Sequence, residues 1–187
     1  MVRQVGPARQ VRPGYVVTYP NRQLTSSRTT KAAVVAILLA SVALMLAVTV
    51  GGWSQLQGLT AVNFAWCIAY LLIAAYVWRW ARGLLPIAAG LAVLLLTISV
   101  IASTGFAGTS WFDRARPGYA AAHSLFGGVG LGANTLGILT LLIAPLQVLL
   151  VVFAMGGFAQ RWNVEYEVPD ERLLAGRGGG RERVPAV

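Results

Sequence analysis

The chain has 187 residues, of which 57% are hydrophobic and 11% charged, and its net charge is +9. Soluble domains average roughly 45–50% apolar and 25% charged residues, so this composition excludes an ordinary soluble globular protein. The sequence predicts an all-α integral membrane protein, a four-transmembrane-helix bundle in which the N and C termini are both cytoplasmic.

Residues 1–30 form a basic tail that contains no Asp or Glu. We expect this tail to lie in the cytoplasm, where its arginines attract anionic lipid at about 1 kcal/mol each. A cleaved signal peptide is the rival interpretation of the tail and the apolar run that follows. That run is longer than the roughly 7–15 apolar residues of a signal sequence, so we expect a retained first span.

Four apolar segments follow within residues 31–160. Each is long enough to cross a hydrocarbon core of about 30 Å, which requires roughly 20 helical residues. Only helices satisfy their own backbone hydrogen bonds there, so each segment should be a helix. The expected spans are residues 31–52, 59–80, 84–104 and 131–158, with an outer loop at 105–130.

Positive charge sets the expected orientation, because Lys and Arg near span ends stay in the cytoplasm. Arg79 and Arg82 lie in the second turn and Arg161 follows the last span, whereas the first turn carries no charge. Arg114 and Arg116 in the outer loop count against this pattern. The bias toward Arg, Ala and Val, with a single Lys, favours a bacterial protein of the plasma membrane.

The spans contain no acid, and this absence limits the chemistry that the protein can perform. The first acid is Asp113, and the other five follow the last span. Proton-coupled transport and intramembrane hydrolysis normally need an ionisable group within a span. With one Cys and one His in the chain, we expect no disulfide, no metal and no cofactor. We expect neither enzymatic activity nor nucleic-acid binding.

Polar residues within the spans are the candidates for contacts between helices or with a partner. They are Asn63, Asn134 and Gln147, because an amide in hydrocarbon needs a hydrogen-bond partner. Asn63 and Asn134 are expected near the outer ends of spans two and four, where they could meet. Gln147 follows Pro145, which frees a carbonyl and favours a kink. The pair either lines a small cavity or simply marks the kink.

The first span carries small residues at helical spacing, a pattern that lets helices approach closely. These residues are Ala32, Ala36, Ala40, Ala43, Ala47 and Gly51. Packing inside the bundle explains this pattern as well as association with another chain does, and an alanine-rich chain also produces such spacings by chance.

The outer loop carries the remaining candidates for lipid or partner contact. They are Trp111, Phe112, Asp113, Arg114, Arg116 and His123. The aromatic residues should rest at the membrane interface. The charged residues could bind a lipid headgroup or an anionic cofactor, or recognise a partner subunit.

The C-terminal tail, residues 161–187, begins with an alternating pattern that is typical of a strand. Its apolar residues are Trp162, Val164, Tyr166 and Val168. Residues 15–19 of the N-terminal tail are also rich in strand formers. We expect the two tails to pair as a short cytoplasmic β-ribbon, and the last dozen residues, rich in Gly and Arg, to be disordered.

These observations favour a non-catalytic accessory or scaffold subunit of a larger membrane protein complex. Its partners would be the bilayer and other membrane subunits, or further copies of itself. The alternative is a small facilitator or channel for a neutral solute, acting as an oligomer. A third hypothesis is an enzyme that uses Asp113, His123 and the outer-loop arginines on a lipid-linked substrate.

Overall fold

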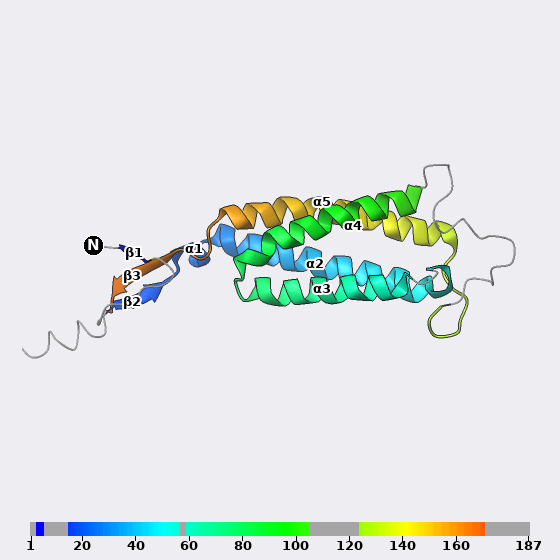
Figure 1. Ribbon diagram of the computed structural model, residues 1–187, viewed down its shortest axis with the longest axis horizontal. Helices are drawn as coiled ribbons and strands as arrows, with labels where there is room; N and C mark the ends of the chain where they lie inside the picture. The colour runs from blue at the N-terminus through cyan, green and yellow to red at the C-terminus, as the bar shows by residue number, and fades with distance from the viewer. Residues whose placement is uncertain (1–2, 6–14, 57–58, 105–123, 171–187) are drawn as a thin grey trace, which may run out of the picture.

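A computed structural model describes residues 3–5, 15–56, 59–104 and 124–170. Four long helices run side by side: α2 (Thr25–Gly51), α3 (Thr60–Trp78), α4 (Leu85–Thr104) and α5 (Ala133–Ala159) (Figure 1). The short helix α1 (Pro20–Gln23) precedes them, and the 3-10 turns η1 (Trp53–Gln55) and η2 (Arg82–Leu84) lie in the connections.

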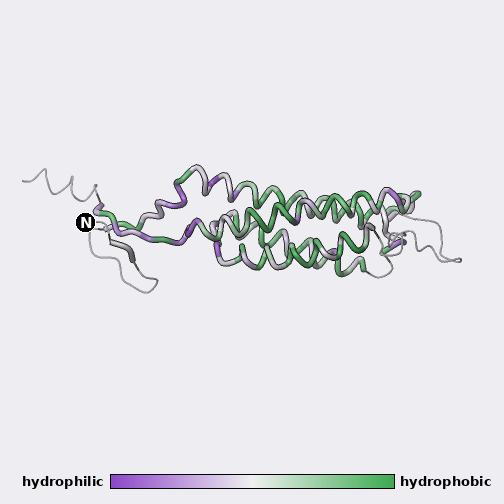
Figure 2. Tube along the Cα trace, turned by 90° about the horizontal axis from the view of Figure 1, so that it is seen from above, coloured by the Kyte–Doolittle hydropathy of each residue, from purple (hydrophilic) through white to green (hydrophobic). Residues whose placement is uncertain are grey.

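All four long helices are long and apolar enough to cross a membrane, which confirms the predicted helical membrane bundle. Helix α2 begins at Thr25, before the predicted start of the first span at Lys31. Hydropathy marks only the part of a helix that suits hydrocarbon, whereas backbone hydrogen bonding continues through the polar first turns. Figure 2 shows apolar residues along the bundle and hydrophilic residues toward the end at which the tails lie.

The bundle has two ends, which we call the termini side and the far side. The termini side carries the described parts of both tails and the turn between α3 and α4, and the far side carries η1 and residues 124–132. Helix α5 packs along α4 and α2, and α2 packs along α3. Helices α3 and α4 have few contacts with each other although they are consecutive in the chain. This separation leaves room for a cavity between them.

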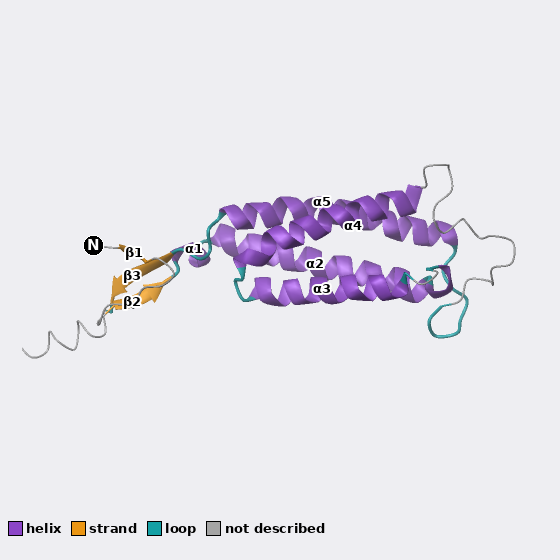
Figure 3. Ribbon diagram, viewed as in Figure 1, coloured by secondary structure: helices purple, strands orange, loops and turns teal. Residues whose placement is uncertain are grey.

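A three-stranded sheet joins the two tails beyond the termini side (Figure 3). Its strands are β1 (Arg3–Val5), β2 (Tyr15–Thr18) and β3 (Glu165–Pro169), in the order β1-β3-β2. Both outer strands are antiparallel to β3, with Val16 opposite Val168 and Thr18 opposite Tyr166. The predicted pairing of the tails is therefore confirmed.

The predicted C-terminal strand was wrong at its start. Strand β3 begins at Glu165, so Val164 precedes it and Trp162 lies in the hydrophobic core of the bundle. An alternation of apolar residues is expected of a strand, but it also occurs in an irregular segment that buries one aromatic side chain against the helices. Strand β1 was not predicted, because three residues are too few to show a period of two.

The register of β2 against β3 predicts one specific crosslink. In a Cys67→Ala background, Val16→Cys with Val168→Cys should oxidise to an intramolecular disulfide. Directly opposite Cα atoms lie about 4.5–5.5 Å apart, within the range that disulfides need. Val17→Cys with Val168→Cys is the matched control, because adjacent register positions point to opposite faces. Mass spectrometry after thiol alkylation checks both pairs, and equal oxidation of the two would contradict the register.

Two neighbouring glycines near the end of α5 should respond differently to substitution. A Cβ at Gly157 would lie 3.1 Å from the Trp162 ring and 3.2 Å from Leu85, whereas Gly156 has open space. We therefore expect Gly157→Leu to cost about 1–3 kcal/mol by overpacking. Gly156→Leu should be neutral or stabilising, since Gly is a poor helix former by about 1 kcal/mol. Unfolding of both variants in mixed micelles, followed by circular dichroism, measures the difference.

Candidate functional site

A buried hydrogen-bonded cluster joins three helices in the middle of the bundle. The Tyr70 hydroxyl of α3 donates to Gln147 Oε1 of α5 at 2.8 Å, and Gln147 Nε2 donates to Ser41 Oγ of α2 at 2.9 Å. Ser41 in turn donates to the Ile37 carbonyl at 2.8 Å. Gln147 is fully buried. The structure thus places this candidate residue in contacts between helices, where each polar group of its amide has a partner.

The other two candidate amides do not meet. Asn63 Nδ2 of α3 donates to Thr49 Oγ1 of α2 at 3.3 Å, while the Asn134 side chain is exposed. The expected contact between Asn63 and Asn134 was therefore wrong. Sequence position gives the depth of a residue in the membrane, but only the rotation of each helix decides which neighbour it faces.

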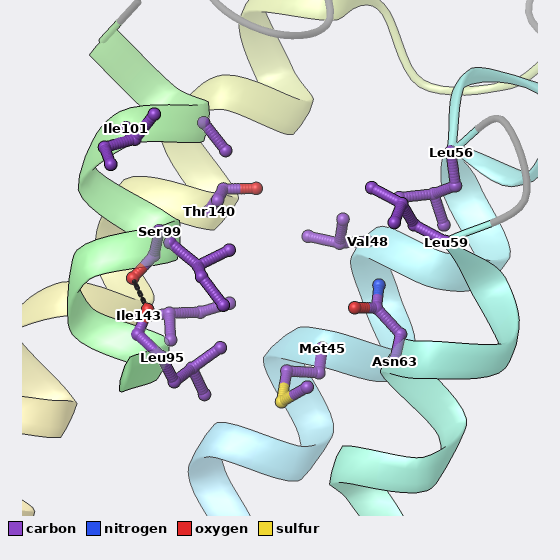
Figure 4. A pocket seen from close by; sticks show the side chains of 12 residues that line it. Met45, Val48, Leu56, Leu59, Asn63, Leu95, Ser99, Ile101, Thr140 and Ile143 are labelled. Atoms are coloured by element: carbon purple, nitrogen blue, oxygen red, sulfur yellow. Dashed lines mark hydrogen bonds between the residues drawn. The ribbon is translucent and has the colours of Figure 1, made fainter. Parts of the chain in front are cut away.

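A cavity of about 270 Å³ lies toward the far side of the bundle (Figure 4). The described residues that line it are apolar except for Asn63 of α3, Ser99 of α4 and Thr140 of α5. Pro145 lies inside α5, and neither Pro145 nor Gln147 lines this cavity. Ser99 and Thr140 were not predicted, because hydroxyl side chains in apolar helices commonly bond to their own backbone and carry no signal.

The termini side is closed by an aromatic and cationic group of side chains that we call the collar: Tyr19, Arg22, Lys31, Trp80 and Trp162. The Trp80 and Trp162 rings meet edge to face with centroids 5.3 Å apart. Lys31 Nζ lies 4.1 Å from the centroid of the Trp80 ring, and Arg22 Nε donates to the Trp162 carbonyl at 3.1 Å. The collar connects the sheet to the bundle.

Two residues at the collar have backbone conformations that L-residues rarely adopt. Trp80 has φ of 67° and Arg161 has φ of 50°. Such a left-handed residue costs roughly 1–2 kcal/mol, which the surrounding contacts must offset. The contacts of Trp80 within the collar and the Asn21 Nδ2 bond to the Arg161 carbonyl, at 3.0 Å, hold these turns in place.

A further hydrogen bond attaches the sheet to the collar. The Tyr19 hydroxyl donates to Glu165 Oε1 at 2.9 Å, and this bond raises the pKa of Tyr19 above its ordinary value of 10.0. A raised pKa means that the bond contributes stability at pH below about 10 and is lost as the pH rises through the pKa of the folded protein. The attachment is therefore intact at neutral pH.

The candidate outer-loop residues, from Trp111 to His123, lie outside the described residues. Among the residues that the structure does describe, no three His, Cys, Asp or Glu side chains gather as a metal site. The fold and its polar groups define a multi-pass helical membrane protein with a small sheet formed by both tails. Comparisons with protein-family models, curated proteins and solved structures found no match.

Proposed function

We propose that this protein is a non-catalytic accessory or scaffold subunit of a larger membrane protein complex in a bacterial plasma membrane. The observation that carries the proposal is a narrow face of small residues on the outside of α2. Small residues let a second helix approach closely, whereas lipid chains gain little from such a face.

Five alanines make up this face, which we call the alanine face: Ala32, Ala36, Ala40, Ala43 and Ala47. All five side chains are exposed. Their spacing of three and four residues places them on one side of the helix. The core of the bundle is formed by the opposite side of α2, which includes the buried Leu38 and Met45. Packing inside the bundle therefore does not account for the pattern, and a helix from another chain remains as its occupant.

The tails supply a second surface for a partner. Because β3 is the central strand, β1 and β2 each have one edge without a neighbouring strand among the residues that the structure describes. Exposed edges accept an extended segment from another chain. Val16 of β2 is 47% exposed, so a side chain of such a segment could pack on it. The collar would hold this edge at a constant position relative to the alanine face.

The orientation that we propose places both termini in the cytoplasm. Arg22, Lys31 and Arg82 lie on the termini side, where the cations pack on aromatic rings. Lys and Arg near span ends favour the cytoplasmic side, and they also attract anionic lipid. The far side, with the cavity, would then face the outer leaflet.

A pull-down with quantified stoichiometry tests the proposal. The tagged full-length chain, at native expression level in a mild detergent, should carry one or more membrane proteins at fixed stoichiometry. Ala36→Leu with Ala40→Leu should reduce their recovery several-fold, because two larger side chains hold a partner helix away. Ala65→Leu on the exposed side of α3 is the matched control and should leave recovery unchanged.

The outcomes separate a subunit from its alternatives. A homogeneous oligomer of this chain alone, broken by the same substitutions, would assign the alanine face to self-association and overturn the accessory role. No partner and no oligomer would overturn both. Unchanged recovery with the double substitution would show that the alanine face is not the contact.

A facilitator for a neutral solute is the second candidate, because three polar residues line the cavity. The fully buried Tyr70 and Gln147 side chains fill the bundle between this cavity and the termini side. We therefore expect no flux of glycerol or urea through the purified protein in liposomes. Flux above that of protein-free liposomes, and raised by Gln147→Ala, would favour the facilitator.

A further inference from the structure

The cavity opens sideways, between two helices, toward the surface that would face lipid. Its walls come from Leu59, just before α3, from Asn63 of α3 and from Ser99 of α4, with α2 and α5 behind. Ile98 and Ile101 of α4 line the cavity and are also more than half exposed, at 52% and 51%. They form the rim of a mouth between α3 and α4, which have few contacts with each other. A membrane-dissolved molecule could enter here without crossing water.

Thr140 is the unusual polar group in this cavity. The hydroxyls of Ser41, Thr49, Thr97 and Ser99 each donate to the backbone carbonyl four residues earlier, as is common in apolar helices. Thr140 makes no such bond. Its residue is only 7% exposed, its Oγ1 is buried without a hydrogen-bond partner, and Figure 4 shows it directed into the cavity.

A buried hydroxyl without a hydrogen-bond partner is destabilising, so a ligand that pairs with it regains the lost free energy. Asn63 lies on the facing wall (Figure 4). Its Nδ2 is committed to Thr49 Oγ1, whereas among the described residues nothing donates to its Oδ1. The Thr140 hydroxyl, which can donate and accept, and the Asn63 Oδ1 acceptor therefore line the same cavity. A ligand hydroxyl can accept from Thr140 or donate to Asn63, because it is both an acceptor and a donor.

We propose that this cavity binds the hydroxyl end of a neutral membrane amphiphile that enters between α3 and α4. Among the residues that the structure describes, none that line the cavity is charged, and an ionised headgroup would be costly beside them. The volume suffices for the end of such a molecule, since an apolar cavity of about 150 Å³ holds benzene. The rest of the apolar chain would extend over Ile98 and Ile101 into the bilayer.

The inner end of the cavity limits how far the ligand reaches. Met45 and Ile143 lie at this end, and Ser41 and Gln147 follow one helical turn deeper on the same two helices. Because these deeper groups already bond to each other, they offer the ligand no further polar partner. The ligand therefore ends inside the cavity and does not pass through the bundle. This ligand site does not depend on the accessory-subunit role.

Photolabelling of the full-length protein in lipid nanodiscs tests this site. The probe is hexadecanol with a diazirine near the hydroxyl, compared with diazirine analogues of hexadecane and palmitic acid at pH 8. Mass spectrometry should find the alcohol on cavity residues of α3, α4 and α5, several-fold above either analogue. Thr140→Val removes the hydroxyl at nearly constant shape and should reduce this labelling about five- to tenfold.

Four further variants make the result specific. Thr140→Ser should restore labelling to within about twofold, because it returns the hydroxyl. Thr97→Val is the matched control, since Thr97 is an exposed residue of α4 that bonds to the Val93 carbonyl. It should leave labelling unchanged. Ala102→Phe should fill the cavity and abolish labelling by alcohol and alkane alike, whereas Ala65→Phe on the lipid-facing side of α3 should not.

Three results would overturn the inference. One is equal labelling of the cavity by alcohol and alkane, which would show an apolar groove without hydrogen-bond recognition. Another is preferential labelling by palmitic acid, which would show that the site accepts a carboxylate. The third is alcohol labelling that Thr140→Val leaves unchanged while circular dichroism shows the variant folded.

Discussion

Trp162→Ala should produce the largest loss of stability of any single substitution considered for this protein. The Trp162 side chain is fully buried, its ring packs edge-on to Trp80, and its Nε1 donates to Gln160 Oε1 at 2.9 Å. Truncation of a buried aromatic residue costs about 3–5 kcal/mol. SDS titration in mixed micelles, followed by far-ultraviolet circular dichroism, measures this loss.

The matched control for this substitution is Trp78→Ala. Trp78 lies on the same side of the bundle but is 60% exposed, so its truncation should cost less than about 1 kcal/mol. Trp162→Ala should also loosen the sheet, because Trp162 belongs to the collar that connects β3 to the bundle. Limited proteolysis should then cut the C-terminal tail faster in Trp162→Ala than in Trp78→Ala. Equal losses of stability in the two variants would contradict the core position of Trp162.

Gln147→Leu should cost about 1–3 kcal/mol, because the Tyr70 hydroxyl is left buried without a partner. The substitution nearly preserves volume, so the loss reports hydrogen bonding more than packing. Asn134→Leu, which changes an exposed amide of the same helix, should stay within about 0.5 kcal/mol of the unsubstituted protein. The same SDS titration checks both variants.

A double-mutant cycle with Tyr70→Phe separates the hydrogen bond from other effects. Removal of both partners is less costly than the sum of the single losses, because no unpaired group remains. Hydrogen bonds between membrane helices average about 0.6 kcal/mol and reach about 1.7 kcal/mol, and we expect a coupling energy in this range. A coupling energy of zero would show that Tyr70 and Gln147 do not bond in the bilayer.

The sequence by itself determined the helices and the pairing of the tails. Long apolar runs must be helical in hydrocarbon, because no water is there to satisfy the backbone, and this reasoning needs no tertiary information. The strand formers at residues 15–19 and the alternation around Tyr166 and Val168 likewise predicted the pairing of β2 and β3. Local sequence is enough to predict an element that depends on its solvent, such as a helix in hydrocarbon, or on a short alternating pattern, such as a strand.

Only the tertiary structure decided which residues meet. The sequence predicted the depth of Asn63 and Asn134 in the membrane. The rotation of α3 and α5 about their axes decided that Asn63 bonds to the Thr49 hydroxyl. The same rotations turned the alanine face outward, placed Gln147 between Tyr70 and Ser41, and left Thr140 facing a cavity. In helices that are apolar on every side, hydropathy does not mark an inner face, so helix rotation follows from the packing of all side chains together.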